Sequence, residues 1–527
     1  MSDSGNDPVA HPASDPLLKS GMVVSAMTML SRVAGLTRDI VIAYFFGSSA
    51  AADSFFLAFR IPNFFRRLFA EGAFSQAFIP VLSEYKAKQD RSALQSLLDH
   101  TAGTLGVALL IFTGLGMLCA AGIITVFAAG YVYQEETEKI YLATQMLRIT
   151  LPYLLLISLT AFAGAILNTF GRFAVPAFTP VLLNVSLIAS AIWLRPYFDF
   201  PILALAWGVL IAGLVQFVFQ LPFLARLGLL PRPRIDLKHT GVRRILRLMV
   251  PALFGVSVGQ INLLLDTVLA TFLITGSLSW LYYSDRLLEL PLALFGITIA
   301  TVILPALSRK YVEESTEAFS ETLDWAVKMV LLLGIPASFA LIYLSDILIA
   351  TLFFNGAMTV VDIEMASLSL KAYGAGLAGH MLVKVLAPGY FARQDTKTPV
   401  KIGLIALFFN MLMNLMLIAF LGHVGLALAT SASAFLNAFL LWRGLRLKGI
   451  YHAAQGWVYF AGRLLLSIAA MALFLIWFTP DLTLWLTLSN VDRVRQLLVI
   501  CLLGALVYFL SMVAMGMRPR DFRRKRI

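Results

Sequence analysis

Charged side chains recur inside the long apolar stretches of this chain, where a membrane-spanning helix would ordinarily present only hydrocarbon. Two of these stretches lie near the N-terminus and three lie beyond residue 247. The charged residues within them are Arg32, Arg38, Asp39, Asp53, Arg60, Arg66, Arg67, Glu71, Asp266, Asp285, Arg286, Glu289 and Lys384. Even on lenient insertion scales, one Arg, Lys or Asp at the bilayer centre costs ~2.5–3.5 kcal/mol. We therefore expect most of these residues to face one shared hydrated cavity or one another.

The arginines in these stretches limit the chemistry of the cavity. A guanidinium group is a planar fork of donors that suits the oxygens of phosphate and carboxylate groups. A chamber for organic cations would instead be dominated by carboxylates and aromatic rings. We predict that the cavity binds an anionic headgroup and that Arg32, Arg38 and Arg286 contribute to it.

Simpler roles stay open for several of the other charges. Arg67 and Glu71 are four residues apart, a spacing typical of an ion pair along one helix. Asp285 and Glu289 have the same spacing but carry like charge, so they need partners elsewhere. An alternative role for Asp53, which lies near a predicted helix end, is to cap that helix.

Long apolar helices are the elements that position these charges. Of 527 residues, 59% are hydrophobic and 13% are charged, whereas a soluble domain has roughly 45–50% apolar and about 25% charged residues. The surplus recurs in stretches of about 20 residues, which as helix cross a ~30 Å hydrocarbon core. The sequence therefore predicts an all-α polytopic membrane protein with about fourteen transmembrane helices. We expect them at residues 22–46, 53–82, 100–128, 141–168, 174–194, 201–225, 248–274, 279–308, 323–353, 365–391, 399–420, 423–443, 456–478 and 494–517.

The segments between these helices alternate in charge. Residues 86–91, 226–247 and 518–527 are rich in Lys and Arg, whereas residues 133–139 are acidic. With an even number of helices every basic segment falls on one side, and Lys and Arg favour the cytoplasmic side. We therefore predict that both termini are cytoplasmic.

Similar short segments recur in the two halves of the chain. Pro80 and Pro305 lie in one pair of similar segments, and Pro176 and Pro399 lie in another, at offsets of 225 and 223 residues. Such repeats build transporters whose substrate site lies between two lobes. The predicted divisions are a disordered cytoplasmic tail (1–20), an N-lobe of six helices (21–228), a basic cytoplasmic linker (229–247), a C-lobe of six helices (248–447), two additional helices (448–517) and a basic cytoplasmic tail (518–527).

Other patterns in the sequence have simpler explanations. The glycine pattern at 374–379 lies in an apolar helix with no preceding strand, which favours close helix packing over nucleotide binding. Asn184 begins a formal glycosylation sequon but lies inside a predicted membrane helix. Cys119 and Cys501 lie in separate apolar stretches without metal-type spacing, so we interpret them as packing residues. The sequence has no Walker A, HExxH or GxSxG motif, so it gives no support for ATP hydrolysis or hydrolase chemistry.

Four segments resemble a known family closely. They are "SAMTMLSRVAGLTRD", "ADSFFLAFRIPNFFRRLFAEGAFSQAFIPVLSEY", "SWLYYSDRLLELP" and "VKVLAPGYFARQDTKTPVK". They are similar to the MurJ (MviN) lipid II flippases of the multidrug/oligosaccharidyl-lipid/polysaccharide exporter superfamily, and the resemblance extends over residues 20–517. It implies fourteen helices, two lobes around a cationic cavity, and a groove for the lipid tail formed by the two C-terminal helices.

The resemblance also implies a function and a set of required residues. The expected function is alternating-access transport of undecaprenyl-pyrophosphate-linked disaccharide-pentapeptide (lipid II) from the cytoplasmic to the periplasmic leaflet of the inner membrane, for cell wall synthesis. The expected partners are lipid II, membrane lipids and the cell-wall synthesis or division machinery, with no nucleic acid and no enzymatic activity. We expect Arg32, Arg38 and Arg286 to clamp the pyrophosphate. The transport residues implied by the resemblance are Ser31, Arg32, Arg38, Asp39, Asp53, Arg66, Glu71, Ser279, Asp285, Arg286 and Lys384.

Some members of this family have a sodium site, and the matching residues here are Asp266, Asn410, Asn414 and Thr430. Asn410 and Asn414 are four residues apart on a predicted helix, so their oxygens face one way, and oxygen ligands suit Na⁺. Asn414 stands where relatives have an aspartate, which removes one charge. A packing role for these amides stays open, as do Na⁺ and the membrane potential as the energy source.

Two other functional classes are the alternatives. A drug or cation antiporter of the same superfamily would need acidic residues where this N-lobe has arginines. A membrane enzyme acting on polyprenyl pyrophosphates would need a cluster of His or carboxylate residues in the loops at 129–140, 354–364 or 479–492, and these loops contain no histidine.

Overall fold

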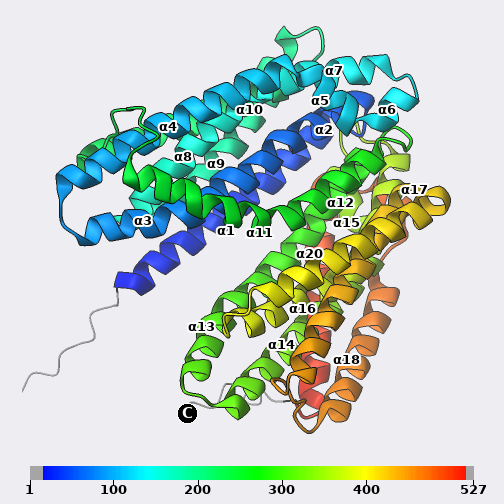
Figure 1. Cartoon of the computed structure of the whole chain (residues 1–527). Coiled ribbons are helices and arrows are strands. Elements are labelled where there is room, and N and C mark those ends of the chain that lie inside the picture. The colour runs from blue at the N-terminus through cyan, green and yellow to red at the C-terminus, as the bar shows by residue number, and fades with distance from the viewer. Residues whose placement is uncertain (1–15, 518–527) are drawn as a thin grey trace, which may run out of the picture. The chain divides into compact units, whose positions relative to one another are not determined.

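The computed structural model describes residues 16–517, and the backbone in this range is helical apart from turns and short connections (Figure 1). The predicted all-helical membrane fold is confirmed. The helices of the first half are α1 (Pro16–Phe46), α2 (Ala50–Phe65), η1 (Arg66–Phe74), α3 (Ser75–Ala87), α4 (Arg91–Leu118), α5 (Ala120–Phe127), α6 (Ala129–Tyr133), α7 (Thr137–Thr150), α8 (Pro152–Thr169), α9 (Ala174–Ala189), η2 (Ser190–Leu194), η3 (Arg195–Tyr197) and α10 (Leu203–Leu227). Those of the second half are α11 (Thr240–Ala270), α12 (Ser277–Pro291), η4 (Leu292–Ile297), α13 (Thr298–Val312), α14 (Thr316–Tyr343), α15 (Ser345–Phe353), α16 (Val360–Phe391), α17 (Lys397–Leu447), α18 (Trp457–Phe478), α19 (Leu482–Thr487) and α20 (Asn490–Ala514).

Each of the fourteen predicted ranges falls on helical backbone. Within residues 16–517, nine helical spans are long and apolar enough to cross a membrane, the longest being α17 with 51 residues. The remaining predicted ranges lie in α1, in α2 to α3, in α11, in α16 and in the second half of α17. All of these except the half of α17 contain charged residues from the set given above, and together they contain most of that set. That half continues from the first across a kink at Gly422, which has φ 54° and ψ −130°.

The second helix of each predicted lobe contains a π-helical stretch at a matching place. In the first half η1 follows Pro62, and in the second half η4 follows Pro291. Moving η1 along the chain by the 225-residue offset of the repeat gives residues 291–299, a range that contains η4. Because proline lacks a backbone N–H, it interrupts the regular hydrogen-bond pattern of the helix. π-Helical turns of this kind are frequent at functional sites.

Packing divides the chain into two compact units. The first consists of the residues up to Arg38, 65–118 and 148–253, and the second consists of 39–64, 119–147 and the residues from 254 onward. The chain passes from one unit to the other inside α1, α7 and α11, near the end of α2, and at the break between α4 and α5. Three of these crossings lie within a few residues of Pro62, Pro152 or Pro251.

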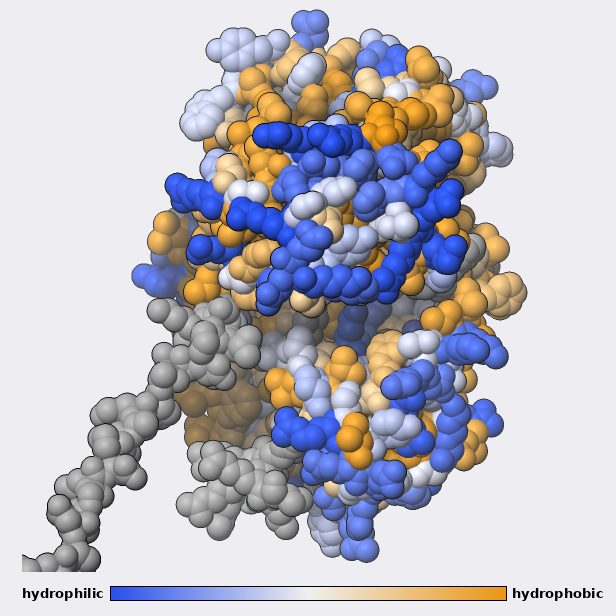
Figure 2. All heavy atoms as spheres, turned by 60° about the vertical axis from the view of Figure 1, so that its left-hand side comes forward, coloured by the Kyte–Doolittle hydropathy of each residue, from blue (hydrophilic) through white to orange (hydrophobic). Residues whose placement is uncertain are grey.

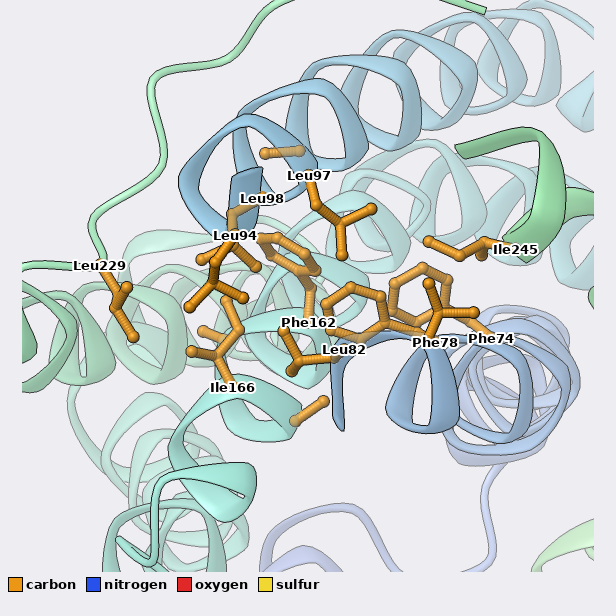
Figure 3. Close-up of a cluster of buried hydrophobic side chains, with 14 of the residues drawn as sticks. Phe74, Phe78, Leu82, Leu94, Leu97, Leu98, Phe162, Ile166, Leu229 and Ile245 are labelled. Atoms are coloured by element: carbon orange, nitrogen blue, oxygen red, sulfur yellow. The ribbon is translucent and has the colours of Figure 1, made fainter. Parts of the chain in front are cut away.

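A cluster of buried aromatic and aliphatic side chains holds the first unit together (Figure 3). Phe78 lies at its centre, with its ring 5.1 Å from those of both Phe74 and Phe162. Leu229 and Ile245 pack into the same cluster from the two ends of the segment that joins α10 to α11. The cluster therefore fixes the ends of this segment against α3, α4 and α8.

The two C-terminal helices, α18 and α20, pack against each other within the second unit. Their attachment to α14 depends on Asp324, which is 3% exposed and accepts hydrogen bonds of 2.8 Å from both Tyr451 and Trp457. Lys328 completes this network with an ion pair of 2.7 Å to Asp324. The Tyr508 hydroxyl of α20 donates to the Leu332 carbonyl of α14 at 2.7 Å.

The surface of the molecule is largely apolar, as expected for contact with lipid. Figure 2 shows a face on which hydrophilic side chains are gathered in patches, with hydrophobic side chains around and between them. On α4 the exposed side chains include Leu110, Ile111, Leu115 and Leu118, and on α20 they include Leu503. These faces have the composition of helices that contact hydrocarbon.

Candidate functional site

Asp53 caps the N-terminus of α12, a helix more than 220 residues further along the chain. Its Oδ2 accepts from the Gly276 backbone N–H at 2.6 Å, and its Oδ1 accepts from the Ser279 N–H at 2.9 Å and the Ser279 hydroxyl at 2.6 Å. The carboxylate therefore satisfies N–H groups that the helix leaves without partners, at the end where the helix dipole favours negative charge. The alternative capping role is thus correct in kind, but the capped helix is α12 and not the helix that contains Asp53.

Asp39 and Arg286 meet beside Tyr282. The Tyr282 hydroxyl donates to Asp39 Oδ1 at 2.9 Å, and the Arg286 Nε lies 3.9 Å from Asp39 Oδ2. Arg286 also donates from Nη1 to Glu289 at 2.7 Å and lies over the Tyr282 ring, 4.8 Å from its centroid. The ring of Tyr282 is in turn stacked on Phe56 with centroids 4.0 Å apart. An arginine predicted to bind substrate is therefore held between two carboxylates.

Backbone contacts extend this arrangement along the same end of the second unit. The Tyr283 hydroxyl donates to the Gly47 carbonyl at 2.9 Å, and the Ala357 N–H donates to the Tyr44 carbonyl at 2.9 Å. Lys139 donates to Thr275 at 2.7 Å. We call Asp39, Asp53, Ser279, Tyr282 and Arg286 the latch cluster, because together with these contacts they join the ends of α1 and α2 to α12.

Ser31 and Arg38 are organised within the first unit by Asn184 of α9. Arg38 Nη1 donates to Asn184 Oδ1 at 3.0 Å, and Asn184 Nδ2 donates to the Ser31 carbonyl at 3.1 Å. Gly35 lies between them on α1, and an added Cβ there would be 3.6 Å from the Asn184 amide. Asn184 was interpreted from the sequence only as an unusable glycosylation signal, yet it holds two of the predicted transport residues.

The remaining predicted transport residues differ in how far the structure describes them. Arg32 is half-buried on α1, Lys384 is exposed on α16, and Asp285 is half-buried on α12 next to Arg286. Arg66 lies at the first position of η1, and the side chain of Glu71 lies outside the described residues. Arg32 and Arg38 thus belong to the first unit and Arg286 to the second.

The four residues predicted to bind Na⁺ do lie together. Asn414 Nδ2 donates to Asp266 Oδ1 at 2.6 Å and to Asn410 Oδ1 at 3.0 Å, and Asn410 Nδ2 lies 3.4 Å from the Thr430 hydroxyl. Asn262 adds a fifth polar group, with its Nδ2 3.4 Å from Asp266 Oδ2. The buried Asn414 Oδ1 has no hydrogen-bond partner in the described part of the chain. The Asn410 amide is better satisfied when it is turned, because its nitrogen then donates to Asn262 Oδ1 at 2.8 Å and its oxygen accepts from the Thr430 N–H at 3.1 Å. Side-chain oxygens of this kind suit a hard cation.

A second intramembrane arginine contact lies next to these residues. Arg60 of α2 donates from Nη1 to the Thr267 hydroxyl and, at 3.4 Å, to the Leu263 carbonyl, both on α11. These backbone and hydroxyl oxygens satisfy part of the half-buried Arg60 guanidinium. Arg60 therefore joins α2 to the helix that carries Asp266.

Among the described residues outside the membrane-spanning helices, Glu84, Asp395 and His239 have shifted pKa values. Hydrogen bonds from Arg244 and then Lys88 lower the pKa of Glu84. A hydrogen bond from Lys448 is the largest of the effects that hold the pKa of Asp395 well below its usual range. Burial lowers the pKa of His239. All three shifts favour the charge state that these groups have at neutral pH.

Several charged residues within the predicted spans were not expected to be functional from the sequence, among them Arg148, Asp324 and Lys371. Arg148 lies on α7 inside the 33-residue helical span Thr137–Thr169, five residues from its centre at Tyr153, and its side chain is exposed. Gln145 and Tyr141 lie one and two turns before Arg148 on the same face of α7. The signal that could have found it is the charge itself, within the predicted range 141–168.

Comparison with known proteins gives a consistent result over nearly the whole chain. A family model described as "Lipid II flippase MurJ" matches residues 42–495. The chain is 51% identical over 512 residues to the probable lipid II flippase MurJ of Vibrio cholerae, covering 96% of this chain and 98% of the relative. It is 40% identical to the lipid II flippase MurJ of Burkholderia cenocepacia, covering 97% and 99%.

Solved structures agree with these sequence relatives. A lipid II flippase MurJ in an inward closed conformation superposes with a TM-score of 0.79 and 27% identity, covering 95% of this chain and 100% of that structure. An inward-facing multidrug resistance transporter of the MATE family superposes with a TM-score of 0.66 and 15% identity, covering 81% and 98%. The second likeness concerns the fold alone.

Proposed function

Because the chain belongs to the MurJ family of lipid II flippases, we propose that its buried polar residues bind and release the headgroup of lipid II. The protein is a multi-pass transporter of the inner membrane that moves a peptidoglycan precursor, and it is not an enzyme. The proposed direction is from the cytoplasmic to the periplasmic leaflet, by alternating access, with both termini on the cytoplasmic side. The Lys- and Arg-rich segments on one predicted side support this orientation.

The proposed binding groups for the pyrophosphate are Arg32, Arg38 and Arg286. Arg38 is already oriented by Asn184, and a donor fixed before the ligand arrives loses less conformational entropy on binding. Ser31, Asp285, Arg66, Glu71 and Lys384 are proposed to surround the same headgroup. Asp39 and Glu289 neutralise Arg286 until phosphate oxygens take their place.

The observation that carries this proposal is the latch cluster. A transporter that releases its substrate on the far side must open the contacts that close that side. Asp53 accepts three hydrogen bonds from α12, and Asp39 accepts one from Tyr282, so opening exposes carboxylates and N–H groups that water can then satisfy. We propose that the latch cluster is the periplasmic closure, and that substrate at Arg286 weakens it by competing with Asp39.

The proposed coupling ion is Na⁺ at Asp266, Asn410, Asn414 and Thr430. The support is the meeting of these four side chains and the unpartnered Asn414 Oδ1. These residues would hold the ion through oxygen atoms alone, and the membrane potential would add to the driving force on any cation that binds there. The proposed protein partners are the enzymes of cell wall synthesis and division, which maintain cell shape.

A reversible cross-link across the closure tests this function. The Ser48 hydroxyl lies 3.5 Å from the Met358 sulfur, so a Ser48→Cys, Met358→Cys pair, with Cys119 and Cys501 replaced by serine, can form a disulfide between the end of α1 and the segment before α16. We expect oxidation to stop lipid II movement in proteoliposomes, a reductant to restore it, and lipid II binding to persist throughout. Each single cysteine variant is the control and should transport lipid II in both conditions. Full transport by the cross-linked protein would refute the closure.

A further inference from the structure

An apolar cavity of about 360 Å³ lies within the first unit and shares no residue with the latch cluster. Its walls come from α4, α8 and α10, and it is covered by the extended segment 230–236 that follows α10. Every residue that lines it is apolar or glycine, including Gly106 on α4, Leu159 on α8 and Leu221 on α10. Phe162 of the cluster in Figure 3 forms part of its wall. A cavity with this lining provides no side-chain hydrogen-bond partner for water, and it is suited to bind hydrocarbon.

The covering segment is a fixed part of the structure. Asp99 of α4 accepts from the Arg232 N–H at 2.8 Å through its side chain and from the Arg234 N–H at 3.0 Å through its carbonyl. Gln95, one turn earlier, donates to the Leu230 carbonyl at 3.1 Å. At Gly103 the Arg234 backbone comes so close that an added Cβ would overlap with it. The cover is therefore held on α4 by backbone contacts that do not depend on the side chains of its own residues.

The same segment has one apolar edge and one basic edge. Pro231, Pro233 and Ile235 line the cavity, whereas Arg232 and Arg234 alternate with them and are exposed. In the part of the chain that the structure describes, neither of these two guanidinium groups makes a hydrogen bond or an ion pair. A segment with hydrocarbon on one side and free cations on the other fits the boundary between lipid tails and headgroups.

We propose that this cavity holds an acyl chain of an anionic phospholipid, with the lipid phosphate bound by Arg232 and Arg234. The apolar walls can bind the acyl chain, and the two unpaired guanidinium groups favour a lipid with a negatively charged headgroup. This inference goes beyond the transport site, because it assigns a second lipid to the first unit. The bound lipid would hold the segment that joins α10 to α11 at the cytoplasmic surface given by the proposed topology.

The chain offers a matched pair of substitutions that tests the cavity. Gly106 lines it and Gly114 does not, although both lie on α4 and an added Cβ at either would meet no atom within 4 Å. Gly106→Leu therefore fills the cavity, and Gly114→Leu makes the same change in helix propensity elsewhere. A third variant, Arg232→Gln with Arg234→Gln, removes the charges and leaves the apolar walls intact.

Binding of phosphatidylglycerol and of phosphatidylethanolamine to each purified protein in detergent is measured by native mass spectrometry. We expect the unmodified protein to bind phosphatidylglycerol at least fivefold more than phosphatidylethanolamine. Gly106→Leu should lower phosphatidylglycerol binding by at least fivefold, whereas Gly114→Leu should leave it unchanged. The arginine variant should bind both lipids equally. Equal binding of the two lipids by the unmodified protein, or equal binding by both leucine variants, would overturn the proposal.

Two further outcomes are decisive as well. If Gly106→Leu does not fold, the arginine variant decides alone, since its exposed side chains lie outside the core. If Gly106→Leu removes lipid II binding and leaves phosphatidylglycerol binding intact, the occupant is the prenyl chain of the substrate and the anionic-lipid site is wrong. Lipid II transport by each variant is also measured in the presence of each phospholipid. If the proposed flippase function is wrong, transport is absent from every variant, including Gly114→Leu.

Discussion

Arg286 is hydrogen-bonded at one end of its guanidinium, whereas the other end is buried and faces Asp39. Nη1 donates to Glu289, whereas Nε makes no hydrogen bond among the described residues and lies 3.9 Å from Asp39. A phosphate oxygen therefore has to compete with Asp39 or Glu289 for this guanidinium. Arg38 differs, since its guanidinium donates to the neutral amide of Asn184.

At this scale we predict that Arg286→Ala and Arg38→Ala each lower lipid II transport by more than tenfold, because a hydrogen bond to a charged group is worth about 1.5–3 kcal/mol. Arg286→Lys should not restore transport, since an ammonium group cannot engage two oxygens in one plane. Arg495→Ala is the control, because that side chain is 70% exposed and is paired with Asp492. Transport and melting temperature are measured together. If the variants that lose transport also have a strongly lowered melting temperature, these arginines only stabilise packing.

Among the elements, α18 and α20 are attached to α14 by buried polar contacts and present apolar faces outward. Leu464 is 4% exposed and packs inside the pair, whereas Leu503 is 41% exposed. A polyprenyl chain is much longer than the acyl chains around it and requires an apolar surface beside the cavity. The outer face that includes Leu503 is the candidate surface for it.

We therefore predict that a photo-reactive amino acid at Leu503 captures the prenyl chain of lipid II, and that the same group at Leu464 captures protein. Mass spectrometry of the adducts identifies the attached part of the lipid. Attachment only through the sugar or peptide of the headgroup would contradict a tail-binding role for these helices.

The junction between α16 and α17 depends on Asp395. This carboxylate accepts from the Thr398 N–H at 3.0 Å and from the Lys448 ammonium at 2.8 Å. Its pKa in the folded protein lies below the ordinary value of 3.8, so its contribution to stability is fully present above that value and is lost as the pH falls through the folded pKa. We predict that Asp395→Asn lowers the melting temperature at pH 7, and that the difference from the unmodified protein shrinks as the pH falls below 3.8. A difference that stays constant from pH 7 to pH 3 would show that the charge of Asp395 is not involved.

Local sequence patterns predicted the helices well, because a helix needs only neighbouring apolar residues in sufficient number. They predicted less about η1, η4 and the short helices α6 and α19, since no residue spacing marks a change from α- to π-helical turns. The pairing of Asp53 with α12 depends on contacts across 223 residues and more, which periodicity does not encode. Asn184 is the clearest case, because its role arises only when α9 lies beside α1.

For the whole molecule, the alternating charge of the connecting segments predicts the topology. Reporter fusions after residues 135 and 240 should report opposite sides of the membrane, with the second on the cytoplasmic side. The acidic segment at 133–139 and the basic segment at 226–247 carry this expectation. Signals from the same side at both positions would contradict the fourteen-helix arrangement.

The places where the chain passes between the two units have a mechanical consequence. Arg38 and Asp39 are adjacent in α1, yet one is bound to Asn184 in the first unit and the other to Tyr282 in the second. Since α1, α7 and α11 cross without an intervening loop, any relative movement of the units has to be taken up as bending or twisting of continuous helix. A helix resists such deformation least where proline removes a backbone hydrogen bond. Pro152 and Pro251 beside two of these crossings are therefore where we expect the continuous helices to bend.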